Sequence, residues 1–193
     1  SFADALKNSV SGLFGIDKKL IYGTDVDKNT LTHIKWEDVF PLLTDERKNY
    51  IIQKQIDKYG FDNTVMPECL TIREVLQIFG TDICRTLDRN CHIRSAINTL
   101  IKDPPTLSAI PDGRFANEFE YFDSDEAKEL LGDTRVWRVK YLRNAHPDNP
   151  PGEQGLPEID HSRYDLIIDN RDMSVLEKND HFIKFFISKG VLS

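Results

Sequence analysis

The first candidates for chemistry are an acidic and a basic residue, Asp112 and Arg114, which stand two positions apart. The apolar run 107–110 before them predicts a buried strand, and a helix is predicted from Asn117 onward, with Glu118 in its first turn. Ligands of open α/β sheets bind at the carboxyl ends of strands. Asp112 and Arg114 are therefore placed to hold a phosphate or a nucleotide through charge-assisted hydrogen bonds. In the alternative interpretation, Asp112 only pairs with Arg114, and Asn117 only caps the helix.

A second group of candidates lies on and after a helix predicted over residues 71–79. Arg73, Gln77 and, beyond a Gly80-Thr81 pair, Arg85 fall near one surface of this helix and its end. Arginine and glutamine side chains suit the recognition of a phosphate and of a base edge. The alternative is a solvated helix face that binds nothing, and the sequence leaves both interpretations open.

The other residues that could carry chemistry form no recognisable site. Asp25 and Asp27 are spaced like two calcium ligands, but the rest of an EF-hand loop is missing. The 5 His residues lack metal-ligand spacing, and the 3 Cys residues form no CxxC motif, so we expect no metal site. An odd number of cysteines without a pattern favours a reduced, cytoplasmic setting. The motifs GxSxG and HExxH do not occur.

Most of the elements that must position these residues are predicted to be helices. Helices are predicted over residues 2–14, 48–59, 71–79, 90–101, 117–131 and 174–187, with a short one around 36–40. The apolar stripe of the second helix is predicted to contain Ile51, Ile52, Ile56 and Tyr59. Thr71 and Glu74 form a capping box at the start of the third, and Gly80 is expected to break or kink it.

Short strands are predicted at 107–110, 134–142 and 164–168, and they alternate with helices in the second half of the chain. This alternation is typical of an α/β fold with a parallel sheet covered by helices on both faces. We expect a single domain over residues 1–193. Residues 143–162 are rich in Pro, Asn, Asp and Gly, and a polar loop of this length is a functional candidate, as a lid or loop.

Composition excludes several classes of protein. The 193 residues are 39% hydrophobic and 30% charged, as in ordinary globular proteins. No apolar run approaches the roughly 20 residues that span a bilayer, so no membrane partner is expected. The net charge of −7 disfavours duplex nucleic acid as a partner and with it a sequence-specific DNA-binding role. A local basic pocket for a phosphate remains compatible with this charge.

Several of these segments, taken in their order, carry a resemblance to a known family. They are SFADALK at 1–7, DKNTLT at 27–32, REVLQIFGTD at 73–82, DxRxxNE at 112–118, GLP at 155–157 and DLIIDN at 165–170. Together they resemble the deoxynucleoside monophosphate kinases of tailed bacteriophages over essentially the whole chain. That family has a P-loop kinase fold and transfers the γ-phosphoryl group of ATP to a deoxynucleoside monophosphate with Mg²⁺. The resemblance implies a host-cytoplasmic location if the protein is phage-encoded.

The resemblance also assigns expected roles to residues of this chain. Asp112 and Arg114 become the catalytic candidates. The candidates for binding the deoxynucleoside monophosphate are Arg73, Gln77, Arg85, Asn117 and Glu118. Residues 143–162 are expected to cover the donor nucleotide, with Arg143 at the start of the loop as the residue that binds the ATP cofactor. ATP and Mg²⁺ are implied by the resemblance alone.

The chain departs from the family at the phosphate-binding loop. The family begins with a strand, a G-x-x-x-x-G-K-[ST] loop and a helix, and these 193 residues contain no such motif. Either an upstream segment supplies it, or the protein has lost it. In this fold the missing strand is central, and each buried backbone group left unpaired costs about 1–3 kcal/mol, against a net stability of about 5–15 kcal/mol. This cost favours an upstream segment.

A second function follows from the missing loop. A kinase relative without a P-loop would be catalytically dead and would act as a binding or structural assembly protein. An unpaired strand edge would favour assembly by strand addition, as a homo-oligomer or with a structural partner. The sequence alone does not decide between the kinase and this alternative.

Overall fold

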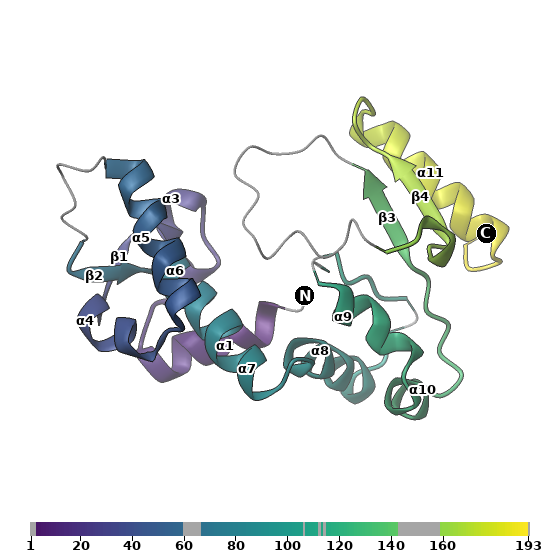
Figure 1. Ribbon diagram of the computed structural model, residues 1–193. Helices are drawn as coiled ribbons and strands as arrows, with labels where there is room; N and C mark the ends of the chain where they lie inside the picture. Colours follow the sequence, from purple (N-terminus) through teal and green to yellow (C-terminus); the bar gives the residue numbers. More distant parts are fainter. Residues whose placement is uncertain are drawn as a thin grey trace. The chain divides into compact units, whose positions relative to one another are not determined.

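The structure is a computed structural model of the chain and describes residues 3–59, 67–105, 107–111, 113, 115–142 and 159–192. Its contacts divide the chain into two units, residues 1–99 and residues 100–193, and each is described by itself (Figure 1). The single domain expected from the sequence stays a prediction. Among the described residues, no helix has the length and apolar character needed to cross a membrane.

Short helices and a two-stranded sheet make up the first unit. Its elements are α1 (Ala3–Phe14), α2 (Lys18–Ile21), α3 (Asp25–Lys28), β1 (Leu31–Lys35), α4 (Trp36–Val39), η1 (Phe40–Leu42), α5 (Asp45–Tyr59), β2 (Cys69–Thr71), α6 (Ile72–Gln77), η3 (Ile78–Cys84), α7 (Arg85–Leu87) and α8 (Cys91–Lys102). Strands β1 and β2 are antiparallel, with Leu31 opposite Thr71 and Lys35 opposite Cys69. Helix α8 begins in this unit and continues past its boundary at residue 99.

The helices and the sheet of the first unit pack on one apolar core, which includes Trp36. Its buried members are Val10, Ile16, Ile21, Trp36, Leu43, Ile51, Leu70, Ile72, Val75 and Ile78. Helix α5 contributes Ile51, and the successive elements β2 and α6 contribute Leu70, Ile72 and Val75. Because α4, α5 and α6 share this core, residues far apart in the sequence meet at one place.

Of two local predictions in this region, the capping box at Thr71 is confirmed. Thr71 caps α6: its hydroxyl accepts from the Glu74 backbone N–H at 3.2 Å, and the Glu74 carboxylate accepts from the Thr71 backbone N–H at 2.8 Å. The helix does not break at Gly80, where the chain continues as a π-helical segment, Ile78–Cys84, that leads into α7. A Cβ added to Gly80 would lie 2.7 Å from Cδ2 of Leu6 in α1, so that side chain would have to move.

The second unit combines helices with a parallel strand pair. Its elements after α8 are α9 (Ala116–Glu120), η4 (Tyr121–Asp123), α10 (Asp125–Leu131), β3 (Val139–Leu142), η6 (His161–Arg163), β4 (Leu166–Asp169) and α11 (Val175–Ser188). Strands β3 and β4 run parallel, in a register that places Val139 opposite Leu166. Helix α11 contacts β4 and buries Phe186, whose ring meets that of Trp137 edge-on at 5.4 Å between centroids.

A shared carboxylate ties three segments of the second unit together. Asp123 accepts hydrogen bonds from Arg138 at 2.6 Å and from Arg163 at 2.8 Å. Both guanidinium groups also lie within 5 Å of the centre of the Phe119 ring, at 4.6 and 4.9 Å. Partial burial raises the pKa of Asp123, but the hydrogen bonds and charges of the two arginines outweigh it and hold that pKa below its usual range. This network is therefore a structural tie between η4, η6 and the approach to β3.

The predicted fold class is confirmed only in its coarse form. The described residues form a mostly helical α/β structure with two small sheets, and one of these sheets is parallel. The large parallel sheet with helices on both faces is wrong for this part of the chain, because each strand pairs with a single neighbour. Residues 107–110 are not a strand, and Leu107 is 45% exposed. The prediction failed because it rested on a short apolar run, which does not by itself specify a strand.

Three further boundaries differ from the sequence prediction. The strand expected over 134–142 is limited to β3. The helix expected over 117–131 is divided into α9 and α10, because the hydroxyl of Ser124 accepts from the backbone N–H of Ala127 and starts a new helix. The polar composition of residues 22–30 predicts a loop, but this stretch contains α3, which Thr24 and Asp27 cap reciprocally.

Candidate functional site

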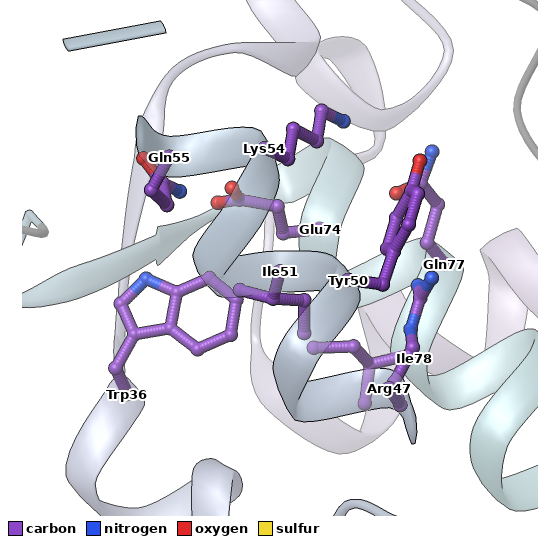
Figure 2. A pocket seen from close by; sticks show the side chains of 9 residues that line it. All are labelled: Trp36, Arg47, Tyr50, Ile51, Lys54, Gln55, Glu74, Gln77 and Ile78. Carbon is purple, nitrogen blue, oxygen red and sulfur yellow. The ribbon is translucent and has the colours of Figure 1, made fainter. Parts of the chain in front are cut away.

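A small pocket opens on the first unit between α4, α5 and α6 (Figure 2). It is lined by Trp36, Arg47, Tyr50, Ile51, Lys54, Gln55, Glu74, Gln77 and Ile78. The depression measures about 290 Å³ including the solvent at its opening, and about 20 Å³ of it can hold the centre of a water-sized group. The pocket is therefore small, with room for about one water-sized polar group.

Helical spacing explains how two helices supply most of this lining. From α5, the lining positions are Arg47, Tyr50, Ile51, Lys54 and Gln55, which follow the i, i+3, i+4, i+7 and i+8 pattern of one helix face. From α6 and the residue after it come Glu74, Gln77 and Ile78, with the same i, i+3, i+4 spacing. The pocket is therefore the seam between α5 and α6, with Trp36 of α4 also in its lining.

Two cations lie on the α5 side of the pocket. The Arg47 Nε donates to Asp82 Oδ2 at 3.2 Å, and its guanidinium lies 5.1 Å from the centre of the Tyr50 ring. Burial raises the pKa of Asp82, although the charge and hydrogen bond of Arg47 act in the opposite direction. Lys54 has no ion-pair partner among the described residues. One cation of the pocket is thus paired, and the other is available to an anion.

The carboxylate of Glu74 belongs to the helix cap. Its Oε2 accepts from both the backbone N–H and the hydroxyl of Thr71, each at 2.8 Å. We therefore assign Glu74 a structural part in the pocket, in which its bonds to Thr71 fix its position. Its charge nevertheless disfavours an anionic group in the interior beside it.

Two buried polar atoms of the lining lack a hydrogen-bond partner among the described residues. They are the indole Nε1 of Trp36, a donor, and the amide Oε1 of Gln55, an acceptor. The two residues are only 6% and 8% exposed. Leaving a buried polar group unsatisfied costs about 1–3 kcal/mol. One bound water, or one ligand group that both accepts and donates, would satisfy this donor and this acceptor together.

The structure places three predicted site residues in the first unit. Gln77 lines the pocket. Arg73, four positions earlier on α6, instead donates to Asp25 at 2.6 Å and to Asn29 at 3.4 Å, in an ion pair that is largely exposed. Arg85 begins α7 and is half-buried. Of the three, Gln77 alone contributes to the pocket lining.

The other predicted binding residues lie in the second unit or outside the described residues. Asn117 and Glu118 are both buried in the first turn of α9. The Glu118 carboxylate accepts from the backbone N–H of Phe115 at 3.2 Å, so Glu118 closes the start of this helix. The helix begins at Ala116, which places Asn117 inside the first turn and not at the capping position of the alternative interpretation.

Three predicted residues and most of the predicted lid cannot be placed. Asp112 and Arg114, the catalytic candidates, lie outside the described residues, as does Arg143. The same holds for residues 143–158 of the segment 143–162. Their expected roles stay predictions.

Sequence reasoning missed most of the pocket because it assigned the buried face of α5 incorrectly. Ile51 is buried as expected, but Ile52 is 42% exposed, and Gln55 takes a buried place that the predicted stripe did not include. The spacing of Arg47 and Lys54 around Ile51 was a usable signal. The place of Trp36 in the pocket lining could not be predicted from the sequence, because it depends on how α4 packs against α5.

Comparison of the chain with protein-family models, curated proteins and solved structures finds no match. The part of the chain that the structure describes has no group of three or more His, Cys, Asp or Glu side chains placed to hold a metal ion. Its glycines with positive φ, Gly15, Gly132 and Gly190, are far apart in the sequence and form no phosphate-binding loop. ATP and Mg²⁺, which the resemblance implies, stay predictions.

Proposed function

We propose that the chain is a deoxynucleoside monophosphate kinase-like protein that binds the acceptor nucleotide at the pocket of the first unit. The observation that carries the proposal is the lining itself, which combines cations, amides and aromatic rings in one seam. A monophosphate needs cationic donors, and a base needs amide partners and an aromatic surface. Transfer of the γ-phosphoryl group of ATP with Mg²⁺ would then require a P-loop from outside these 193 residues.

The cation that we expect to meet the phosphate is Lys54. Arg47 is already bonded to Asp82, whereas Lys54 has no ion-pair partner among the described residues. A charge-assisted hydrogen bond is worth about 1.5–3 kcal/mol, and partial exposure to solvent reduces this to about 1 kcal/mol. Removing the Lys54 charge should therefore weaken monophosphate binding about fivefold, at about 1.4 kcal/mol per factor of ten.

Calorimetric titration of the four common deoxynucleoside monophosphates tests this proposal. Lys54→Gln should weaken binding, and the matched control Lys48→Gln should not, because Lys48 lies on the same helix but pairs with Asp45 and does not line the pocket. Equal effects of the two substitutions would contradict a phosphate contact at Lys54.

A second candidate function, assembly, is favoured by the surface of α11. This 14-residue helix buries Phe186, while Val175, Leu176, Ile183 and Ile187 are exposed. Exposed aliphatic side chains on one helix are typical of a contact surface. Light scattering distinguishes the two candidates: a concentration-dependent oligomer that Leu176→Lys abolishes, without nucleotide binding, would favour assembly over the kinase-like function.

A further inference from the structure

We infer that the side of the pocket formed by Trp36 and Gln55 is a subsite for the edge of a nucleobase, which these two residues recognise. This inference rests on the proposed function and names the part of the ligand that enters. The geometry that carries it is the pairing of one donor, Trp36 Nε1, with one acceptor, Gln55 Oε1, both buried at the same pocket. In the view of Figure 2, the indole nitrogen of Trp36 turns toward the side chain of Gln55.

The pairing of a donor with an acceptor excludes a phosphate from this side of the pocket. A phosphate offers hydrogen-bond acceptors, so its oxygens would satisfy Trp36 but would face the amide oxygen of Gln55 without a proton between them. The carboxylate of Glu74, which also lines the pocket, adds a repulsive charge. The polar interior therefore suits a neutral group that both accepts and donates.

A base edge has this property. Every common base presents an acceptor beside an N–H donor on its pairing edge: a ring carbonyl next to a ring N–H, or a ring nitrogen next to an amino group. The acceptor would take the Trp36 hydrogen, and the N–H would donate to Gln55. The pocket has about 20 Å³ in which the centre of a water-sized group fits, so one such polar group enters and the rest of the ring stays outside.

The phosphate of the same nucleotide needs a cation elsewhere in the pocket. Arg47 and Tyr50 lie away from Trp36 and Gln55 in Figure 2. We assign the phosphate of the same nucleotide to Lys54, which lines the pocket and has no ion-pair partner among the described residues. Trp36 and Gln55 become the residues that recognise the base.

The substitution Gln55→Leu separates this role from a structural one. Leucine removes a buried acceptor that has no partner among the described residues, so the free protein should keep or raise its thermal midpoint. Binding of thymidine and of its 5′-monophosphate should weaken by about tenfold, equivalent to about 1.4 kcal/mol. Deoxyribose 5-phosphate, which lacks the base, should bind the variant and the unsubstituted chain equally. Gln55→Met serves as the second variant if leucine lowers the thermal midpoint.

Gln53→Leu is the matched control, because Gln53 lies on α5 but is exposed and donates to Asp57 at 2.9 Å. The emission of Trp36, isolated by Trp137→Phe in the full chain, reports occupancy of the subsite directly. Thymidine should shift this emission in the Gln53→Leu protein and not in the Gln55→Leu protein.

The outcomes for the subsite and for the proposed function are distinct. If thymidine binds as tightly as its monophosphate, the base subsite stands and the monophosphate function fails. If deoxyribose 5-phosphate binds as tightly as the monophosphate, or if Gln55→Leu changes nothing, the base subsite is overturned while monophosphate binding stands. Absence of binding by all three compounds overturns both.

Discussion

Gly80→Ala tests how the π-helical segment packs against α1. The new Cβ would lie 2.7 Å from Cδ2 and 3.4 Å from Cδ1 of Leu6, so the Leu6 side chain or the helix must move. Overpacking of this kind costs about 1–3 kcal/mol. The replacement of glycine by alanine in a helix raises the free energy of unfolding by about 1 kcal/mol. The expected net loss is thus up to about 2 kcal/mol of the free energy of unfolding.

The effect of Gly80→Ala on the free energy of unfolding should change sign when Leu6 is shortened. In a Leu6→Ala background the clash is gone, and Gly80→Ala should stabilise the protein by about 1 kcal/mol. The coupling energy of the double-mutant cycle is therefore about 1–3 kcal/mol. Urea unfolding followed by circular dichroism measures all four proteins.

Gly12→Ala is the control for backbone effects, because a Cβ there meets nothing within 4 Å and the residue lies inside α1. It should stabilise the protein by about 0.5–1 kcal/mol in either background. The packing argument is refuted if Gly80→Ala lowers the free energy of unfolding equally with leucine and with alanine at position 6.

Two matched substitutions and one titration test the electrostatics. Asp123→Asn should lower the free energy of unfolding by about 1 kcal/mol at neutral pH, because its carboxylate serves two arginines; an unchanged urea midpoint would contradict this. Asp82→Asn should leave stability at neutral pH unchanged or raise it, because burial raises the pKa of Asp82 and its charged form is disfavoured although Arg47 remains its partner; a clear loss in the same assay would refute this. Hydrogen bonds from Arg171 lower the pKa of Asp169 to about 2, so the stability that this carboxylate contributes is present above its unfolded pKa of 3.8 and is lost as the pH falls through about 2. Carbon-detected NMR titration should find that midpoint, and Arg171→Gln should move it back toward 3.8.

Local signals of the sequence predicted local structure well. The Thr71 and Glu74 pair marked the start of α6, and the start predicted at Ser174 is the N-cap of α11, where Ser174 and Glu177 form a capping box. These signals succeed because both partners lie within one helical turn and need no information from the rest of the chain.

Features that depend on distant partners were not predictable. Strand β1 becomes a strand because β2, more than 30 residues later, pairs with it, and the hydroxyl of Thr32 donates to the Leu70 carbonyl at 2.8 Å. The burial of Gln55 depends on the packing of α5 against its neighbours, and a polar side chain gives no apolar signal for it. Conversely, residues 107–110 had the composition of a buried strand, but no strand pairing is described for them.

We propose above that the first unit binds a deoxynucleoside monophosphate at the seam of α5 and α6. Calorimetric titration of the unsubstituted 193-residue chain with each of the four common deoxynucleoside monophosphates is the test of this binding. We expect saturable binding of at least one of them with one site per chain, weakened about fivefold by Lys54→Gln and unchanged by Lys48→Gln. Absence of saturable binding for all four at concentrations up to about 1 mM, the weak end of ordinary ligand affinities, would contradict it.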